Sequence, residues 1–318
     1  RDVAVTGVQT CALPISGTID QQVVQRREKR MPIVKILVPV VGGNRDAAVL
    51  AAGVEAARPF NAHVVALFVR PDPKEALPYL SEGVSGGVVE DVVRIYKDVS
   101  DKASENVKKA IDAVCMASGA KPVASVQRGQ GVTISYREAQ GGFGDRLVEE
   151  ARVSDLIVFS PLAQNDRLGL TEAFELVLLE TDRPVLIAAE TPPPAFAKCV
   201  LIGWDGGTSA AQAMSAVCPY LKNSEKVELL SVQRPPLQAD LTEKAREYLL
   251  LHGVPSTERV VDPGTKRIGV RFLEAATEAG ADLIVMGGYG HGRLRESLFG
   301  GVTRYVVSHA ATPVLLVH

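Results

Sequence analysis

The sequence predicts an α/β protein made of two tandem, doubly wound parallel-sheet domains. Short runs of valine, isoleucine and leucine alternate with alanine-rich stretches of helical pattern. Continuous apolar runs of this length are typical of strands buried on both faces of a parallel sheet. The same order of runs also occurs twice along the chain. Strands that alternate with helices imply right-handed βαβ units with helices on both faces of the sheet.

The two copies follow one plan, element by element. Each opens with an apolar strand, continues through an alanine-rich helix to a second strand that ends near prolines, and closes with two further strands. The expected segments are 33–41, 47–57, 63–73, 155–160 and 183–189 in the first copy, and 197–205, 209–221, 226–236, 282–287 and 312–318 in the second. The motif DLIV begins at 155 and again at 282, and the closing Pro-Val-Leu begins at 184 and again at 313. Because these two spacings differ by only two residues, we interpret the copies as an internal duplication.

We therefore expect a first domain over 31–190, a linker over 191–198 and a second domain over 199–318. Three consecutive prolines exclude a helix or strand in the linker. Most of the extra length of the first domain falls in 74–120, where apolar residues recur every three or four positions and predict an amphipathic helix that covers the sheet. The glycines of 129–144 predict a mobile loop. The apolar positions of the helix are Val92, Val93, Tyr96, Val99, Ala103, Val107, Ala110 and Val114.

Residues 1–30 do not follow this plan. They show neither a helical nor a strand period, and they end in a charged run directly before Met31. A signal peptide would carry its basic run ahead of an apolar region, which is the opposite order. We interpret Met31 as the native start and 1–30 as a non-native or disordered leader that resembles translated cloning-adapter sequence. Its removal is expected to leave the melting temperature unchanged.

Composition favours a cytoplasmic protein that binds neither nucleic acid nor membrane. The formal net charge is −2 and aromatic residues make up 5% of the chain, which argues against a nucleic-acid surface. No apolar run reaches the roughly 18 residues that a membrane span needs. The four cysteines form no CxxC pair, so we expect buried free thiols in a reducing compartment. The five histidines lack the spacing of metal ligands, and no metal site is expected.

A glycine-rich segment follows the expected strand 282–287 of the second copy. The strand runs into Gly287 and Gly290, and after nine intervening residues Gly300 and Gly301 precede a helical stretch. Glycines at the carboxyl end of a parallel strand allow the backbone to approach a phosphate closely. The free N–H groups at the start of the next helix would attract an anion. The segment therefore predicts a nucleotide site.

The spacing G-x2-G-x9-G resembles the ATP-binding signature of the universal stress protein family, in which a serine or threonine stands where this chain has Gly301. The resemblance extends over 31–318 as a tandem pair. It implies an adenine nucleotide α-hydrolase-like, Rossmann-like fold and a stress-response role. It also implies ATP, or ADP or AMP, as the bound nucleotide, with or without Mg²⁺. Self-association, as an intramolecular pseudo-dimer or a homodimer, is implied as well.

The resemblance also implies the residues of the site. Asp205 matches an aspartate on the adenine or ribose side, although it could instead cap the following helix. Val232 matches an apolar contact to adenine, while Trp204 departs from the family and could crowd or stack on the base. Arg293 and Arg295 could add positive charge or form a solvated helix face. The expected set is Gly203, Trp204, Asp205, Val232, Met286, Gly287, Gly290, His291, Arg293, Gly300, Gly301, Val302 and Thr303.

The first copy lacks this signature. Val41 stands where the second copy has Asp205, and Pro161 follows the expected strand 155–160, with Gly169 the only glycine between Ser160 and Glu175. A loop with a proline and without paired glycines offers fewer N–H donors. We therefore expect the first domain not to bind ATP in the manner of the family.

Three functions compete at this point. The first is an ATP-binding stress or regulatory protein. The second is an assembly module in which nucleotide is incidental. The third is an enzyme on a similar fold, but no phosphate-activating loop and no catalytic constellation is legible. We expect no enzyme activity beyond slow ATP hydrolysis.

Overall fold

A computed structural model describes residues 33–72, 86–127, 129–162, 169–232, 239–288 and 301–318. The chain divides into two units, Arg1–Pro32 and Ile33–His318, and every described residue belongs to the second unit. The leader therefore lies outside the described residues, as do Gly290, His291, Arg293, Arg295 and Gly300.

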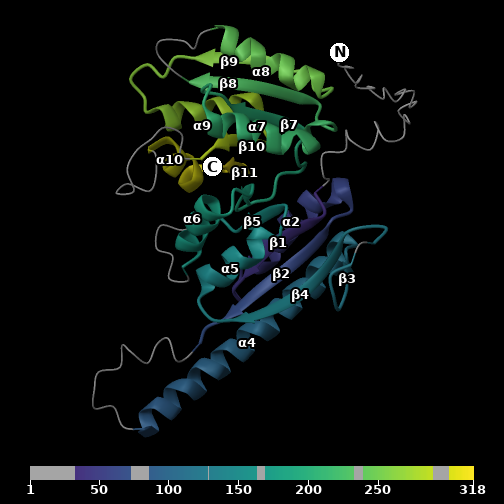
Figure 1. Ribbon diagram of the computed structural model, residues 1–318, viewed down its shortest axis with the longest axis vertical. Helices are drawn as coiled ribbons and strands as arrows, with labels where there is room; N and C mark the ends of the chain where they lie inside the picture. The colour runs from purple at the N-terminus through teal and green to yellow at the C-terminus, as the bar shows by residue number, and fades with distance from the viewer. Residues whose placement is uncertain (1–32, 73–85, 128, 163–168, 233–238, 289–300) are drawn as a thin grey trace, which may run out of the picture. The chain divides into compact units, whose positions relative to one another are not determined.

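The described elements alternate as the repeat predicts (Figure 1). The first repeat contains β1 (Lys35–Val40), α2 (Asp46–Ala57), η1 (Arg58–Phe60), β2 (His63–Arg70), α4 (Gly86–Ser118), β3 (Lys121–Pro122), β4 (Thr133–Gln140), α5 (Phe143–Arg152), β5 (Leu156–Phe159), α6 (Leu170–Glu180) and β6 (Val185–Ile187). The second contains β7 (Cys199–Gly203), α7 (Thr208–Leu221), β8 (Lys226–Val232), α8 (Ala239–Leu251), β9 (Thr257–Val261), α9 (Ile268–Ala279), β10 (Leu283–Gly287), α10 (Gly301–His309) and β11 (Val314–Val317). Neither helix nor strand occurs in the linker 191–198.

The eleven strands described form one sheet in the order β3-β4-β2-β1-β5-β6-β11-β10-β7-β8-β9. Every pairing within a repeat is parallel, which confirms the predicted fold class. The repeats meet where β6 and β11 pair antiparallel, with Leu186 opposite Leu315. These are the two apolar closing strands, and each covers the edge that the other would leave exposed.

Helices cover both faces of this sheet, as a doubly wound fold requires. Buried side chains of α2, α4, α7 and α8 form one hydrophobic core with one set of strand residues. Those of α5, α6, α9 and α10 form a second core with the alternate set. Along β1, for example, Ile36 and Val38 belong to the first core and Leu37 to the second. This alternation follows from the two-residue period of a strand.

Aspartates at equivalent positions of the two repeats bind neighbouring strands of the sheet together. Asp155, directly before β5, accepts a hydrogen bond from the backbone N–H of Lys35 at 3.0 Å. Asp282, directly before β10, accepts one from the N–H of Cys199 at 3.2 Å. These aspartates begin the duplicated DLIV motif, so the duplication is visible in the hydrogen bonds as well as in the sequence.

A buried tyrosine joins the two repeats on the first core. The side chain of Tyr220 in α7 is almost completely buried, and its hydroxyl donates to the backbone oxygen of Ala56 in α2 at 2.9 Å. Its ring makes edge contacts with Phe60 and with Phe196 of the linker, at centroid distances of 4.9 and 5.5 Å. Burial raises the pKa of Tyr220 well above its ordinary value, so the hydroxyl stays protonated.

Two expectations for the first repeat are wrong or hold only in part. Segment 129–144 is not a mobile loop, because it contains β4, which pairs with β2 over eight residues. The long helix packs over the sheet only in its carboxyl half, where Val107 is fully buried. In the amino half Val93 and Val99 are 39% and 64% exposed, and Figure 1 shows this half of α4 running beyond the strands.

Candidate functional site

The predicted site lies at the carboxyl ends of β7 and β10, which are neighbours in the sheet. From β7 the chain continues to β8 on one side, and it returns to form β10 on the other side. Such a reversal of strand order opens a crevice at the carboxyl edge of the sheet, which is where open α/β sheets bind ligands. Gly203, Asp205, Met286 and Gly287 all lie at this edge.

Two of the predicted glycines are required by close packing. A Cβ on Gly287 would lie 2.6 Å from the backbone nitrogen of Ala210 and 2.7 Å from the carbonyl carbon of Ser209. The end of β10 therefore touches the first turn of α7. A Cβ on Gly203 would lie 2.9 Å from the ring of Phe272 in α9. Because glycine has no Cβ, the backbone of α7 can lie against Gly287 and the ring of Phe272 against Gly203.

The turn from β7 into α7 is open to solvent. Asp205 and Gly206 are exposed, and Gly206 has a φ of +74°, the left-handed region that glycine adopts without strain. Asp205 does not cap the helix itself: its Oδ1 accepts a hydrogen bond from the N–H of Gly207 at 2.8 Å, and Gly207 is the N-cap. No side chain caps the first turn of α7. The amino end of this helix can therefore donate to an anion.

Trp204 is buried beside this turn. The residue is 8% exposed and belongs to the first core. Its backbone N–H donates to the oxygen of Leu230 at 2.8 Å, and its backbone oxygen accepts from the hydroxyl of Ser231 at 2.7 Å. Its indole nitrogen is enclosed and has no hydrogen-bond partner in the structure described.

The other predicted residues within the described chain take different positions. Val232 ends β8 and is partly buried, and Met286 is 7% exposed and belongs to the second core. Gly301 begins α10, and a Cβ there would meet nothing within 4 Å. Val302 packs on the second core and Thr303 is buried. The structure thus brings the ends of β7, β8 and β10 to one edge.

In the first repeat the equivalent turn is filled. Asp46, which stands where the second repeat has Ala210, accepts hydrogen bonds from the N–H groups of Val41 at 3.2 Å and Gly42 at 2.7 Å. This carboxylate is 3% exposed, and burial raises its pKa although the backbone donors partly offset that effect. In the first repeat the Asp46 carboxylate therefore binds the backbone N–H groups of the turn. The second repeat has Ala210 at the equivalent position and so has no such internal carboxylate.

Helix α4 then covers the filled turn. Gly42 has a φ of +79°, and a Cβ there would lie 2.5 Å from the Cβ of Ala103. The side-chain amide of Asn106 donates to the oxygen of Gly42 at 3.3 Å. Together with Asp46, this contact gives a physical reason for the difference between the two repeats.

Two features of the site were missing from the sequence prediction. The first is the amino end of α7, whose residues Ser209 and Ala210 touch Gly287. The pair Gly206-Gly207 directly after a strand could have indicated it. The second is Gly288, whose N–H donates to the oxygen of Val317 at 2.7 Å and whose missing Cβ would lie 3.1 Å from Leu178 of α6. The edge of the site is thus in contact with the first repeat.

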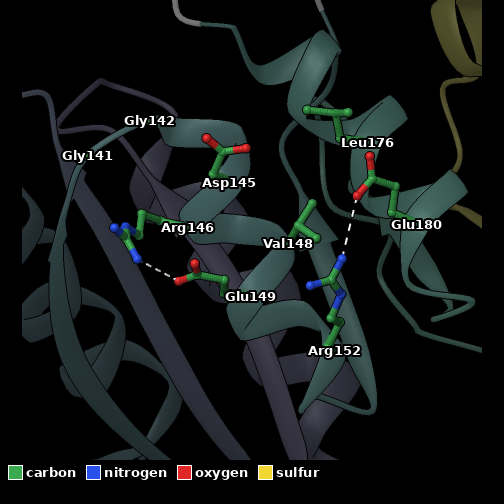
Figure 2. A pocket seen from close by; sticks show the side chains of 9 residues that line it. All are labelled: Gly141, Gly142, Asp145, Arg146, Val148, Glu149, Arg152, Leu176 and Glu180. Atoms are coloured by element: carbon green, nitrogen blue, oxygen red, sulfur yellow. Dashed lines mark hydrogen bonds and ion pairs between the residues drawn. The ribbon is translucent and has the colours of Figure 1, made fainter. Parts of the chain in front are cut away.

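A surface cavity of about 350 Å³ lies elsewhere, between α5 and α6 of the first repeat. Figure 2 shows two ion pairs among its charged side chains, Arg146 with Glu149 at 2.8 Å and Arg152 with Glu180 at 3.6 Å, while Asp145 is drawn without one. Because both arginines that line it are already paired with glutamates, the cavity offers little to an anionic ligand such as a phosphate. It does not coincide with any predicted site residue.

Other ligand classes find little support in the described residues. Within these ranges no group of histidine, cysteine and carboxylate side chains could hold a metal ion. Within the described ranges Cys115, Cys199 and Cys218 form no disulfide bond, and Cys11 lies outside the description. No helix in the described part of the chain has the length and apolarity to cross a bilayer.

Comparisons with known proteins agree with a pair of Rossmann-like domains. Residues 213–318 match the model of the universal stress protein family. A universal stress protein from Archaeoglobus fulgidus aligns with a TM-score of 0.60 at 14% identity, over 89% of this chain and 97% of its own. A functionally unknown protein from Pseudomonas aeruginosa aligns with a TM-score of 0.53 at 15% identity, over 90% of this chain and 92% of its own. No curated protein matches the sequence.

The second repeat therefore contains a universal stress protein domain, as its glycine spacing predicted. At such low identity the aligned structures show the fold alone. That fold extends over both repeats, because the Archaeoglobus fulgidus structure covers most of the chain.

Proposed function

We propose that this chain is an ATP-binding universal stress protein with a regulatory role in the cytoplasm, and that its second domain holds the nucleotide. ADP or AMP could take the place of ATP, with or without Mg²⁺. Nucleotide occupancy would be the signal, and chemical turnover would be limited to slow hydrolysis. The family match of 213–318 supports this proposal.

The contact between Gly287 and the first turn of α7 is the observation that carries the proposal. It places the uncapped amino end of a 14-residue helix directly beside the end of β10. Backbone N–H donors and the helix dipole are suited to phosphate oxygens. Asp205, exposed on the same turn, can accept hydrogen bonds from a ribose or an amino group of the base. Partly buried Val232 offers an apolar surface to the base.

The filled turn of the first repeat supports binding at one site per chain. Asp46 occupies the donors there, and Ala103 closes on Gly42. A phosphate would have to displace a buried carboxylate of the same charge and also a helix. Binding in the first repeat is therefore disfavoured by charge repulsion and by packing.

Titration calorimetry with ATP tests the proposal. We expect one site per chain and a loss of affinity of about fivefold or more in Asp205→Ala, since one hydrogen bond contributes on the order of 1 kcal/mol. Gly290→Glu should abolish binding, because the glycine spacing predicts that this position approaches the phosphates. Asp98→Ala removes the same charge from an exposed position on α4 and should leave the affinity unchanged. Two sites per chain, or full affinity in Gly290→Glu, would refute the proposal that only the second domain binds the nucleotide.

A second candidate is an assembly module in which nucleotide is incidental. The antiparallel pairing of β6 with β11 favours it, because this pairing holds the repeats together without a ligand. Mass spectrometry of the purified, denatured protein separates the two candidates. Stoichiometric adenine nucleotide supports the binding protein, whereas protein that carries none and shows no heat on titration with ATP supports the assembly module.

A further inference from the structure

The amino half of α4, residues 86–100, carries an apolar stripe that belongs to neither hydrophobic core. The helical period places this stripe on the same face as Val107 and Val114, which are buried in the first core. The face of α4 that covers the sheet therefore continues past the sheet. We call this continuation the amino stripe; its members are the partly buried Val89 and Val92 and the exposed Val93, Tyr96 and Val99.

The sheet ends close to where the amino stripe ends. Arg70, the last residue of β2, forms an ion pair with Asp101 of α4 at 2.7 Å. Residues 86–100 precede that contact, and at about 1.5 Å per residue they extend the helix by roughly 22 Å. Figure 1 shows this part of α4 running beyond the strands. The amino stripe is thus a helix face that the sheet does not cover.

The charges around the amino stripe favour a protein partner over a lipid surface. From Glu90 to Lys102 the helix has four acidic and three basic side chains. A helix that lies on a membrane usually carries an excess of lysine and arginine on its polar face, and this helix does not. Stripe residues instead recur at 89, 92, 96 and 99, so that three and four positions alternate. This is the spacing with which one helix packs along another.

A second copy of the same helix fits both the spacing and the charges when the two helices run antiparallel. With Val92 opposite Tyr96 of the second copy, Glu90 comes close to the level of Lys97 of that copy. Within the described residues neither Glu90 nor Lys97 forms an ion pair. The antiparallel arrangement therefore gives each of these two exposed side chains an opposite charge at the rim of the contact.

A parallel arrangement is disfavoured by the same features. It would place Glu90 of one copy beside Glu90 of the other, and like charges repel. It would also direct each helix toward the sheet of the other copy, because the same helix face is already packed in the core at Val107. In the antiparallel arrangement the two sheets lie at opposite ends of the contact.

We propose that two copies of this chain form a homodimer through the amino halves of α4, paired antiparallel along the amino stripe. This surface belongs to the first repeat, so the inference does not depend on nucleotide binding in the second. It is also distinct from the junction of β6 and β11, which joins the two repeats within one chain. Because each helix contributes only about four turns, the contact is small, and we expect a dissociation constant on the order of 10–100 μM.

Sedimentation velocity of the full chain under reducing conditions provides the first test. Wild type should change from monomer to dimer as the concentration rises from roughly 1 to 500 μM. Val99→Glu places a carboxylate in the contact and should weaken dimerisation by about tenfold or more, since an unpaired charge is costly to bury. Met116→Glu is the matched control: Met116 is exposed on the opposite face of the same helix, and this variant should dimerise as the wild type does.

Exchange of the charges at the rim tests the direction of the helices. Glu90→Lys alone and Lys97→Glu alone should each weaken dimerisation by about threefold to tenfold, because repulsion replaces attraction at two symmetric positions. The double variant restores opposite charges only in the antiparallel arrangement, and it should dimerise nearly as well as the wild type. Both positions are exposed, so the folded monomer should be unchanged, which circular dichroism checks.

Each result decides for or against the proposal. A wild type that stays monomeric over the whole concentration range overturns it, and the amino stripe is then covered by another part of the chain or by a different protein. Dimers that persist at full strength in Val99→Glu also overturn it, because the contact then lies elsewhere. If Val99→Glu does not fold, the charge variants decide. A double variant that dimerises no better than the single variants rules out the antiparallel pairing.

Discussion

Replacing single glycines by alanine around the site tests whether the end of β10 is built on close packing. In Gly287→Ala the new Cβ would lie 2.6 Å from a backbone nitrogen of α7. Ordinary contact begins near 3.4 Å, so the first turn of α7 must move by about 0.8 Å. Overpacking against backbone of this kind costs about 1–3 kcal/mol. For a protein of this size we expect the melting temperature to fall by roughly 2–10 °C.

Two neighbouring glycines provide graded controls. In Gly288→Ala the nearest atom is the tip of the Leu178 side chain at 3.1 Å, which must shift by only about 0.3 Å, so the cost should stay below about 1 kcal/mol. In Gly301→Ala the new Cβ meets nothing within 4 Å at the start of α10. Alanine is a better helix former than glycine, so this variant should melt with the wild type or slightly above it.

Thermal unfolding followed by circular dichroism measures the series. The expected order of melting temperatures, from the highest, is Gly301→Ala, Gly288→Ala and Gly287→Ala. If Gly287→Ala melts together with the wild type, α7 does not lie against β10 as described, and the argument for a phosphate site beside that helix fails with it.

Two further predictions concern the first core and the pH dependence of stability. Tyr220→Phe removes the hydroxyl that donates to Ala56 and should lower the free energy of unfolding by about 1 kcal/mol in urea titration. For His63, burial first and then the charges of Lys35 and Arg137 lower the pKa of the imidazole in the folded protein. Above the unfolded pKa of about 6.5 this group does not affect stability, and below it the unfolded chain takes up the proton more readily. The free energy of unfolding should therefore decrease as the pH falls below about 6.5, and His63→Gln should weaken that decrease.

Matched measurements can contradict both predictions. Tyr248→Phe removes a hydroxyl that is only partly buried, so its cost should be smaller than that of Tyr220→Phe. Equal costs would show that the bond between the repeats adds nothing. For the imidazole, wild type and His63→Gln are compared between pH 7 and pH 5. Parallel curves would show that His63 is free to take up a proton in the folded protein.

The apolar runs predicted the strands well because burial on both faces leaves a continuous signal. Where that signal weakens, the prediction failed. In β4 the residues Thr133 to Gln140 are partly polar, since this strand lies next to the short edge strand β3, and the glycines at both ends suggested a loop. The stripe of α4 showed helical spacing, but spacing alone cannot tell that Val99 is exposed and Val107 buried.

The strands that carry the predicted site residues could be predicted from the sequence, but the covering of the equivalent turn in the first repeat could not. Glycine spacing and Asp205 indicated the edge of β7 and β10. The covering of the first turn could not be predicted, because Asp46 and Ala103 are 57 positions apart and both contact Gly42 only once α4 has folded back over it. The unpaired indole N–H of Trp204 could not be predicted either, since it loses its hydrogen bond to water only because the ring is buried in the folded protein.

The antiparallel junction of β6 and β11 has a consequence for how the two halves can differ. Because the proline-rich linker holds both halves in one chain, their pairing is intramolecular and does not depend on protein concentration. In a symmetric homodimer any substitution appears at both equivalent positions at once. A covalent pair is free of that constraint. One half can close its turn with Asp46 and Ala103 while the other keeps its turn open, and the shared sheet remains whole.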